Sequence, residues 1–553
     1  DSDGLTISNS TIYGNSQAGV YQETSSDNWT LLNNTLYGIP GVVNQTYGVY
    51  LTGSNHTLSG NTIHDSSYGI RSSGGGGQII TGNTVYSNYS SGIYLGSNGS
   101  GSVVSGNTVS GNGTGIDYSQ SGGTQGTISG NTVHSNSSTG IDATYNVLVS
   151  GNTVYGQSGS GDIGINLDSG ATAIQNVVYS NYYGIVGGGS GNATINNNRV
   201  YNNSNIGILA RYLTNASGNV VYSNSIGIQS AVGGYNNSYS FSGDLTNNLV
   251  YANTNQGIVL DHAQANGSDL PQVINNTVYQ EVGDAIRIQG SSQNVRLRNN
   301  ILWVDAGYDL FVASDSQVGF NSDYNLLHKG PAINAYVGYW GGDRSDFTAW
   351  QAATSNDANS TTPDPDFIDR DGADNVLGYT TSFGGYNGGS DDNFQLSGGS
   401  AAIDRADTWS APETDIKGSL RFDDPGITNL GSLDYGETNS GTSLFAAVGT
   451  AKNWQSNSTY FSLTLPFAFP LYGSTYSSVS VSTEGFLHFA GPNTPSNGTN
   501  TLSELLANVR IAPMWDNLKT NGAGDNIYVD TAIANQVTIR WNGTNIGDNT
   551  DVQ

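Results

Sequence analysis

The chain of 553 residues carries 43 acidic and only 16 basic residues, a formal net charge of −27, and it contains no cysteine. This balance argues against nucleic acids and anionic membrane surfaces as partners, since both need a basic footprint, and the missing cysteines exclude disulfides and thiol chemistry. No apolar run is long enough to span a membrane, and an aromatic content of 10% argues against a disordered chain despite 76 glycines.

Residues 1 to about 330 repeat one phrase, as in SGNTVSGNGTGIDYS, SGNTVHSNSSTGIDAT and SGNTVYGQSGSGDIGINLD. Each unit of about 24 residues holds three short segments of alternating polarity separated by Gly, Asn and Ser, which is typical of strands. Strands that pair with their copies in the next unit predict an all-β, parallel β-helix of about 13 coils with one continuous apolar core. The apolar residues that mark the repeat are Ile12, Leu36, Ile63, Val85, Val109, Val133, Val154, Val178, Val200, Val221, Val250, Val278 and Leu302.

An asparagine stands just before most of these anchor segments. We expect the asparagines to take the left-handed backbone angles of a tight corner and to form a ladder of amide hydrogen bonds between coils. The column comprises Asn83, Asn107, Asn131, Asn152, Asn176, Asn219, Asn248, Asn276 and Asn300.

The units GNTVYSNYSSGIYL and GNTVHSNSSTGID resemble the right-handed β-helix repeats of the pectate-lyase-like superfamily, and its NosD-like repeat proteins in particular. The resemblance implies the right-handed coil, which the spacing alone does not give. It does not select an activity, because this fold hosts lyases, hydrolases, epimerases, adhesins and phage tailspikes.

Residues 331–440 are expected to close and cap the β-helix. NSDYNLL at 321, DFTAWQAAT at 346 and NFQLSGGSAAID at 393 resemble the closing segment of secreted bacterial β-helix proteins, in which a turn, a short helix with a Trp and a final coil end the solenoid. We expect Asp346 to cap a helix and Trp350 to lie in the core of the cap.

Residues 438–450 suggest a linker, and 441–553 are expected to form an antiparallel β-sandwich. PLYGSTYSSVSVSTEGFLHF and IAPMWDNL resemble a nidogen-like sandwich of extracellular proteins. The resemblance leads us to expect further strands after TIRWNGTN, and hence a longer protein.

The candidate site follows from the segment that contains GID. Its Ile points inward, so Asp117 and Asp142 are expected to point outward on neighbouring coils, flanked by Tyr94 and Asn166. Two adjacent carboxylates have three interpretations: a solvated strand face, a Ca²⁺ or glycan contact, or a glycosidase-type acid–base pair. Arg71 and the tyrosines would complete a sugar-binding strip.

Several features count against catalysis by Asp117, Asp142 and Arg71. The lyases that the repeat resembles use a basic residue near bound Ca²⁺, and this chain has no Lys before Lys329. The hydrolase set with Gly-His-Gly and the epimerase Asp-Pro-His motif are absent. The histidines at 64, 134, 262 and 328 lack metal-ligand spacing and are expected at the surface or at corners.

The sequence does not decide the role of two further features. Asp369, Asp371 and Asp374 surround a Gly as in part of a calcium loop, without the distal Glu. Asn-x-Ser/Thr triplets, potential glycan sites that the repeat composition partly explains, occur for example at Asn9, Asn28, Asn44, Asn55, Asn88, Asn112, Asn136 and Asn215.

Together these features predict a secreted or cell-surface structural or adhesive protein. Its solenoid would serve as a rigid scaffold or a glycan-facing surface, with carbohydrates or other surface proteins as partners, no required cofactor, and self-association into a filament or layer as a further option. The alternative is a polysaccharide lyase or glycoside hydrolase.

Overall fold

The computed structural model describes residues 3–22, 26–41, 45–96, 98–234, 236, 238–407, 409–419, 421, 448–471, 474–491, 508–513, 518–534, 536–546 and 551–552. The chain divides into two compact units, Asp1–Gly431 and Ser432–Gln553. In the described part of the chain, no helix is long and apolar enough to cross a membrane.

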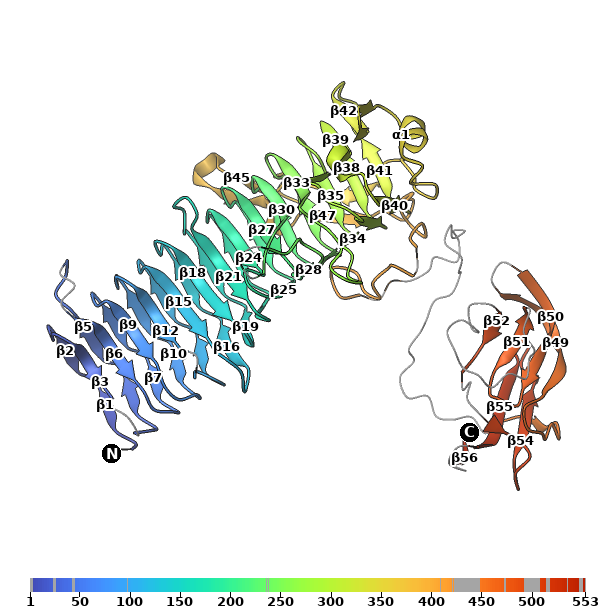
Figure 1. Ribbon diagram of the computed structural model, residues 1–553, viewed down its shortest axis with the longest axis horizontal. Coiled ribbons are helices and arrows are strands. Elements are labelled where there is room, and N and C mark those ends of the chain that lie inside the picture. The colour runs from blue at the N-terminus through green and yellow to red at the C-terminus, as the bar shows by residue number, and fades with distance from the viewer. Residues whose placement is uncertain are drawn as a thin grey trace. The chain divides into compact units, whose positions relative to one another are not determined.

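The first unit is a β-solenoid of three long parallel sheets, here called A, B and C (Figure 1). Sheet A contains β1 (Thr6–Ser8), β4 (Thr30–Leu32), β7 (Thr57–Ser59), β10 (Ile79–Thr81), β13 (Val103–Ser105), β16 (Gly126–Ser129), β19 (Val147–Ser150), β22 (Thr172–Ile174), β25 (Thr194–Asn196), β28 (Asn215–Ser217), β31 (Asp244–Thr246), β34 (Gln272–Ile274), β37 (Arg296–Arg298) and β40 (Asn321–Asp323). Sheet B contains β2 (Thr11–Tyr13), β5 (Thr35–Tyr37), β8 (Thr62–His64), β11 (Thr84–Tyr86), β14 (Thr108–Ser110), β17 (Thr132–His134), β20 (Thr153–Tyr155), β23 (Val177–Tyr179), β26 (Arg199–Tyr201), β29 (Val220–Tyr222), β32 (Leu249–Tyr251), β35 (Thr277–Gln280), β38 (Ile301–Val304) and β41 (Leu326–Lys329). Sheet C contains β3 (Ala18–Tyr21), β6 (Tyr47–Leu51), β9 (Tyr68–Ser72), β12 (Ser91–Leu95), β15 (Thr114–Ser119), β18 (Thr139–Thr144), β21 (Ile163–Asp168), β24 (Tyr183–Gly187), β27 (Ile206–Arg211), β30 (Ile226–Ala231), β33 (Gln256–Asp261), β36 (Ile286–Gln289), β39 (Gly307–Val312), β42 (Ala335–Trp340) and the short antiparallel β43 (Asp343–Arg344).

The predicted stacking is confirmed strand by strand. Val109 of β14 is the Cα partner of Val85 on one side and Val133 on the other, and all three side chains are 0% exposed. Sheets A and B each have 14 strands, more than the predicted 13 coils, because β40 and β41 continue the pattern past Leu302. The alternation within each strand therefore produces one apolar core along the whole solenoid.

The asparagine ladder is confirmed, but its expected backbone role is wrong. The Asn131 amide donates to Asn152 Oδ1 at 2.9 Å and accepts from the Asn107 amide at 2.9 Å. The left-handed angle belongs instead to the preceding residue, as at Gly106 (φ 61°) and Gly130 (φ 62°). The asparagine is 1% exposed and satisfies buried backbone groups, while the glycine before it makes the corner.

The cap helix forms as predicted. α1 spans Phe347–Thr354, and the Asp346 carboxylate accepts a hydrogen bond from the Ala349 backbone N–H at 2.9 Å. Trp350 is 0% exposed and donates through Nε1 to Asp357 Oδ2 at 2.7 Å. The helix thus places an aromatic side chain over the open end of the core.

Residues 364–396, here called the return segment, lie along the outer face of sheet B instead of adding another rung. Its strands pair only with each other, and its short helices are one turn long. They are β44 (Phe367–Asp369) with β47 (Asn393–Leu396), β45 (Tyr379–Thr380) with β46 (Tyr386–Asn387), η3 (Ser382–Gly384) and η4 (Gly388–Ser390); a further short helix, η2 (Ser314–Ser316), follows β39. The segment is attached by hydrogen bonds from Arg199 to the Gly389 carbonyl (2.6 Å) and from Tyr222 to Asn387 (2.8 Å).

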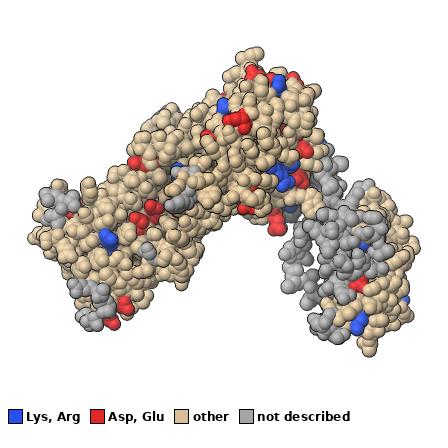
Figure 2. Space-filling model, in the orientation of Figure 1, with Lys and Arg blue, Asp and Glu red and all other residues tan. Residues whose placement is uncertain are grey.

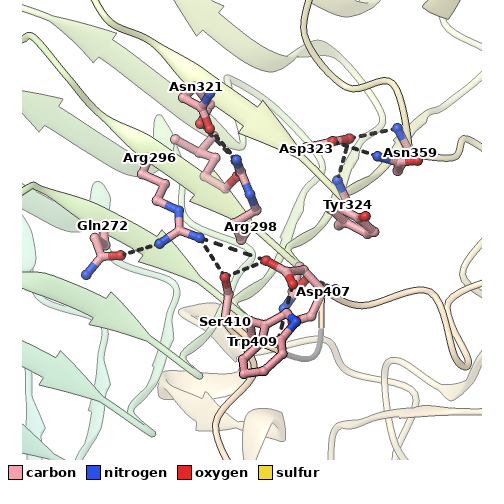
Figure 3. A network of polar contacts seen from close by, with 12 residues as sticks. Gln272, Arg296, Arg298, Asn321, Asp323, Tyr324, Asn359, Asp407, Trp409 and Ser410 are labelled. Carbon is pink, nitrogen blue, oxygen red and sulfur yellow. Dashed lines mark hydrogen bonds and ion pairs between the residues drawn. The ribbon is translucent and has the colours of Figure 1, made fainter. Parts of the chain in front are cut away.

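Polar contacts attach two segments to sheet A, one before and one after the return segment (Figure 3). The Arg296 guanidinium lies 3.8 Å from the Asp407 carboxylate and donates to Ser410 Oγ at 2.8 Å. On the neighbouring coil, Asp323 accepts from the backbone and side-chain nitrogens of Asn359 at 2.7 and 2.9 Å. These contacts extend the first unit well past the last rung.

The second unit contains two antiparallel sheets, as expected for a β-sandwich. Their strands are β48 (Thr450–Ala451), β53 (Leu518–Lys519), β54 (Asn526–Asp530), β55 (Thr538–Asn545) and β56 (Asp551–Val552) in one sheet, and β49 (Tyr460–Leu471), β50 (Ser474–Ser482), β51 (Leu487–Ala490) and β52 (Val509–Ile511) in the other. Val481 of one sheet and Ile527 of the other share a buried core with Trp541. The predicted linker falls largely outside the described residues. Residues 514–517, which belong to the IAPMWDNL motif, also lie outside them.

Candidate functional site

The predicted outward column exists on sheet C with the predicted register. Asp117 is the Cα partner of Tyr94 on β12 and of Asp142 on β18, and Asp142 is the partner of Asn166 on β21. These four side chains are partly buried. The sheet C column reads Tyr21, Tyr50, Arg71, Tyr94, Asp117, Asp142, Asn166, Val186, Leu209, Gln229, Val259 and Arg287.

The N-terminal part of this face is an aromatic platform around one arginine. The Arg71 guanidinium carbon lies 4.8 Å from the Tyr68 ring centroid, 5.1 Å from Tyr94 and 5.6 Å from Tyr47. Among the described residues, no carboxylate forms an ion pair with Arg71, and its Nε has no hydrogen-bond partner. The platform therefore holds a cation by ring contacts alone; the Nε is buried, so the terminal guanidinium nitrogens are the donors that remain for a ligand.

The neighbouring carboxylates are strongly perturbed. Burial, and secondarily the charge of Asp142, raise the pKa of Asp117 from 3.8 to about 7. Burial also raises the pKa of Asp142, while the hydrogen bond that Asn166 donates at 3.0 Å opposes this shift. At neutral pH the pair therefore holds a proton part of the time and can both donate and accept hydrogen bonds.

The acidic loop makes hydrogen bonds within the return segment. The Asp374 carboxylate accepts from the Val376 backbone N–H and from the Tyr386 hydroxyl, each at 2.8 Å. Asp369 lies on β44, and Asp371 accepts from the same Val376 N–H through its backbone carbonyl. In the described ranges, no three His, Asp or Glu side chains are grouped so as to hold a metal ion. Calcium binding here stays a prediction.

The potential glycan sites separate by burial. Asn88, Asn112 and Asn136 belong to a second buried amide ladder and are at most 2% exposed, so their amides are inaccessible in the folded protein. Four of the predicted examples stay exposed, and one, Asn44, lies outside the described residues. The exposed examples are Asn9, Asn28, Asn55 and Asn215.

Sequence reasoning missed a column of stacked rings on the outer face of sheet B. Tyr37 and His64 stack with centroids 5.0 Å apart and an interplanar angle of 1°, and Tyr155 and Tyr179 do so at 4.9 Å and 8°. The signal was the residue after each anchor, as in TIY, TLY, TIH, TVY and TVH. The ring column reads Tyr13, Tyr37, His64, Tyr86, Ser110, His134, Tyr155, Tyr179, Tyr201, Tyr222, Tyr251, Tyr279, Trp303 and His328.

The return segment covers one end of this column. Phe367, Tyr379 and Phe394 pack against the rings from Tyr201 to Trp303, which are at most 9% exposed. Three of the four histidines expected at the surface or at corners, at 64, 134 and 328, are members of the column. Figure 2 shows that the visible face of the solenoid is largely uncharged, with isolated acidic and basic patches.

The fold and these faces can be compared with known proteins. A family model described as right handed beta helix region matches residues 1–156 and 140–302, and a NIDO related model matches residues 433–552. No curated protein matches this chain.

The chain is similar to several solved structures at low identity. The A-module of the Azotobacter vinelandii mannuronan C-5 epimerase AlgE6 is 14% identical over 66% of this chain and 90% of its own, with a TM-score of 0.36. Pectate lyase Pel9A is 14% identical over 73% of this chain and 87% of its own, with a TM-score of 0.30. The Dettilon tailspike protein is 12% identical over 54% of this chain, which spans 60% of the tailspike's length, with a TM-score of 0.34.

Proposed function

The chain belongs to the right handed beta helix family, and we propose that it is an extracellular or cell-surface scaffold whose sheet C binds acidic polysaccharides. The observation that carries this proposal is the unpaired Arg71 guanidinium among Tyr47, Tyr68 and Tyr94. A sugar carboxylate would pair with the guanidinium, and sugar rings would pack on the tyrosines. The solenoid supplies the rigidity that keeps these side chains at fixed spacing.

The carboxylates beside the platform extend the proposed binding strip. A partly protonated Asp117 donates to sugar oxygens, and the Asn166 amide holds the Asp142 carboxylate in place. An ionised pair would instead repel an acidic chain, so binding should weaken as the pH rises through about 7. Calcium bridging between a sugar carboxylate and Asp142 would reverse this dependence, and a titration with and without Ca²⁺ distinguishes the two modes.

A glycan array screened with the full chain, followed by calorimetry on the best acidic ligand, tests the proposal. Tyr68→Ala should weaken binding at least tenfold, and Arg71→Gln should remove the preference for acidic over neutral glycans. Tyr13→Ala, an exposed tyrosine on sheet B, is the matched control and should bind as the parent does. Absence of acidic glycans among the ligands, or equal losses in all three variants, would refute the proposal.

A polysaccharide-active enzyme is the second candidate function, favoured by one observation. Asp117 and Asp142 lie on adjacent strands and the pKa of Asp117 is raised to about 7, which suits a general acid at neutral pH. Incubation with acidic polysaccharides, assayed for unsaturated sugars and for new reducing ends, tests it. Turnover that disappears in Asp117→Asn would establish an enzyme. Absence of turnover by the parent would rule out the enzyme and leave the polysaccharide-binding scaffold as the proposed function.

A further inference from the structure

The ring column of sheet B is interrupted at one rung. Ser110 is the Cα partner of Tyr86 on one side and of His134 on the other, so a hydroxymethyl group stands where the neighbouring rungs carry a ring. Tyr86 stacks on His64 at 4.6 Å, and His134 stacks on Tyr155 at 4.9 Å. Among the described ring pairs, neither Tyr86 nor His134 has a partner on the side of Ser110.

The gap has the dimensions of one missing ring. Strands in a sheet are about 4.8 Å apart, so the two rings that flank Ser110 are separated by about 10 Å between centroids. Elsewhere in the column, the pairs Tyr13–Tyr37, Tyr155–Tyr179 and Tyr179–Tyr201 have centroids 4.9 to 5.1 Å apart and interplanar angles of 4° to 8°. A planar ring placed midway would therefore make the same offset stack with Tyr86 and with His134 that the tyrosines make with each other.

A cavity of about 520 Å³ lies at the turns that follow β11, β14 and β17, the strands of Tyr86, Ser110 and His134. Its lining includes Ser87 and Tyr89 on the coil of Tyr86, Gly111 and Gly113 on the coil of Ser110, and Ser137 on the coil of His134. The same cavity reaches Asp65, whose carboxylate contacts the His64 ring at 2.7 Å.

A ring from outside the repeat packs against the covered end of the column. Phe394 of the return segment lies 4.7 Å from Tyr251 and 6.1 Å from Tyr279, two rings on neighbouring strands. This ring comes from a part of the chain far away in sequence, and it is held by packing against the column. The outer face of sheet B therefore packs against aromatic side chains that come from outside the repeat.

We propose that the gap at Ser110, between Tyr86 and His134, is a binding site for a phenol-type ring, which would complete the ring column. The ring would enter edge first, stack on both neighbours and direct its hydroxyl group to solvent. A puckered sugar ring is thicker than a planar one and fits this spacing less well. The site lies on sheet B, so it does not depend on the function proposed for sheet C.

The test uses 4-methylphenol, the side-chain analogue of tyrosine, with the full chain labelled with ¹³C at histidine. The six histidines give few signals, and His134→Gln identifies the relevant one. The His134 ring signal should shift saturably at millimolar 4-methylphenol, because an aromatic ring stacked on it changes its shielding. Ser110→Tyr should bind at least tenfold more weakly, since its own ring fills the gap, while Ser105→Tyr on sheet A should leave binding unchanged.

Several outcomes would overturn the proposal, the first three of which concern the parent and Ser110→Tyr. These three are an unsaturable His134 shift in the parent, an unchanged shift in Ser110→Tyr, and a larger shift with methyl β-glucopyranoside than with 4-methylphenol. Ser110→Leu provides a second blocked variant in case the tyrosine disturbs the fold, and thermal unfolding of each variant checks this directly. A folded Ser110→Leu that binds 4-methylphenol as the parent does would equally overturn it.

Discussion

Asp117 and Asp142 occupy equivalent positions on adjacent strands of sheet C, and the charge of Asp142 adds to burial in raising the pKa of Asp117 to about 7. Repetition of the motif GID in consecutive coils creates this relationship, because parallel pairing in register places identical residues side by side. Like charges at this spacing disfavour simultaneous ionisation. The carboxylates therefore titrate as a coupled pair.

Replacing Asp142 by Asn should lower the pKa of Asp117. The pKa should fall below about 7 but stay above 3.8, because burial is the larger cause and is unchanged by the substitution. Carboxyl ¹³C shifts followed by NMR as a function of pH measure it. A pKa that does not move would show that the two carboxylates are not electrostatically coupled; Asp65→Asn, on another face, is the control.

Asp117 should make the protein more stable at acidic than at neutral pH. Its pKa is raised in the folded state, so its contribution to the free energy of unfolding is fully present below pH 3.8 and is lost as the pH rises to about 7. Asp117→Asn should flatten this dependence and add on the order of 1–2 kcal/mol at pH 8 after allowing for solvent screening. Urea unfolding at several pH values measures the effect, with the exposed Glu281→Gln as control. A variant with the parent's pH profile would contradict it.

Asn131→Ala should destabilise the solenoid strongly. The Asn131 side chain bonds to Asn107, Asn152 and the Val104 carbonyl, each at 2.9 Å, and its loss leaves buried donors and acceptors unpaired. We expect a loss of about 2–4 kcal/mol, measured by urea unfolding. Asn192→Ala, at an exposed position, should cost little. Equal effects of both substitutions would show that the asparagine ladder does not contribute to the free energy of unfolding beyond what an exposed asparagine does.

Trp350→Ala should loosen the capped end of the solenoid. The Trp350 ring is fully buried against Gly338, where an added Cβ would lie 2.3 Å from it, and is bonded to Asp357. Its removal leaves a cavity that should cost about 3–5 kcal/mol. Hydrogen exchange should increase first in β42 and β39. The exposed Trp409→Ala is the control, and uniform exchange along the solenoid would contradict a local capping role.

The sequence predicted the parts of this fold that depend on neighbouring coils. Inward Ile116 and outward Asp117 follow from the alternation within one strand, and the pairing of Asp117 with Asp142 follows from the repeat. The ladder of asparagines also follows from the repeat, although the left-handed angle belongs to the residue before each asparagine and not to the asparagine itself. Such contacts join equivalent positions of successive units, so the period alone defines them.

Contacts between residues that the repeat does not relate became known only from the tertiary structure. The packing of Phe394 on Tyr251 joins segments more than a hundred residues apart in sequence, and no repeat relates them. Likewise, the burial of Asp117 and the isolation of Arg71 among three tyrosines depend on side-chain packing across several coils. Burial is a property of everything around a residue, whereas the sequence specified only which residue stands next to which along the stack.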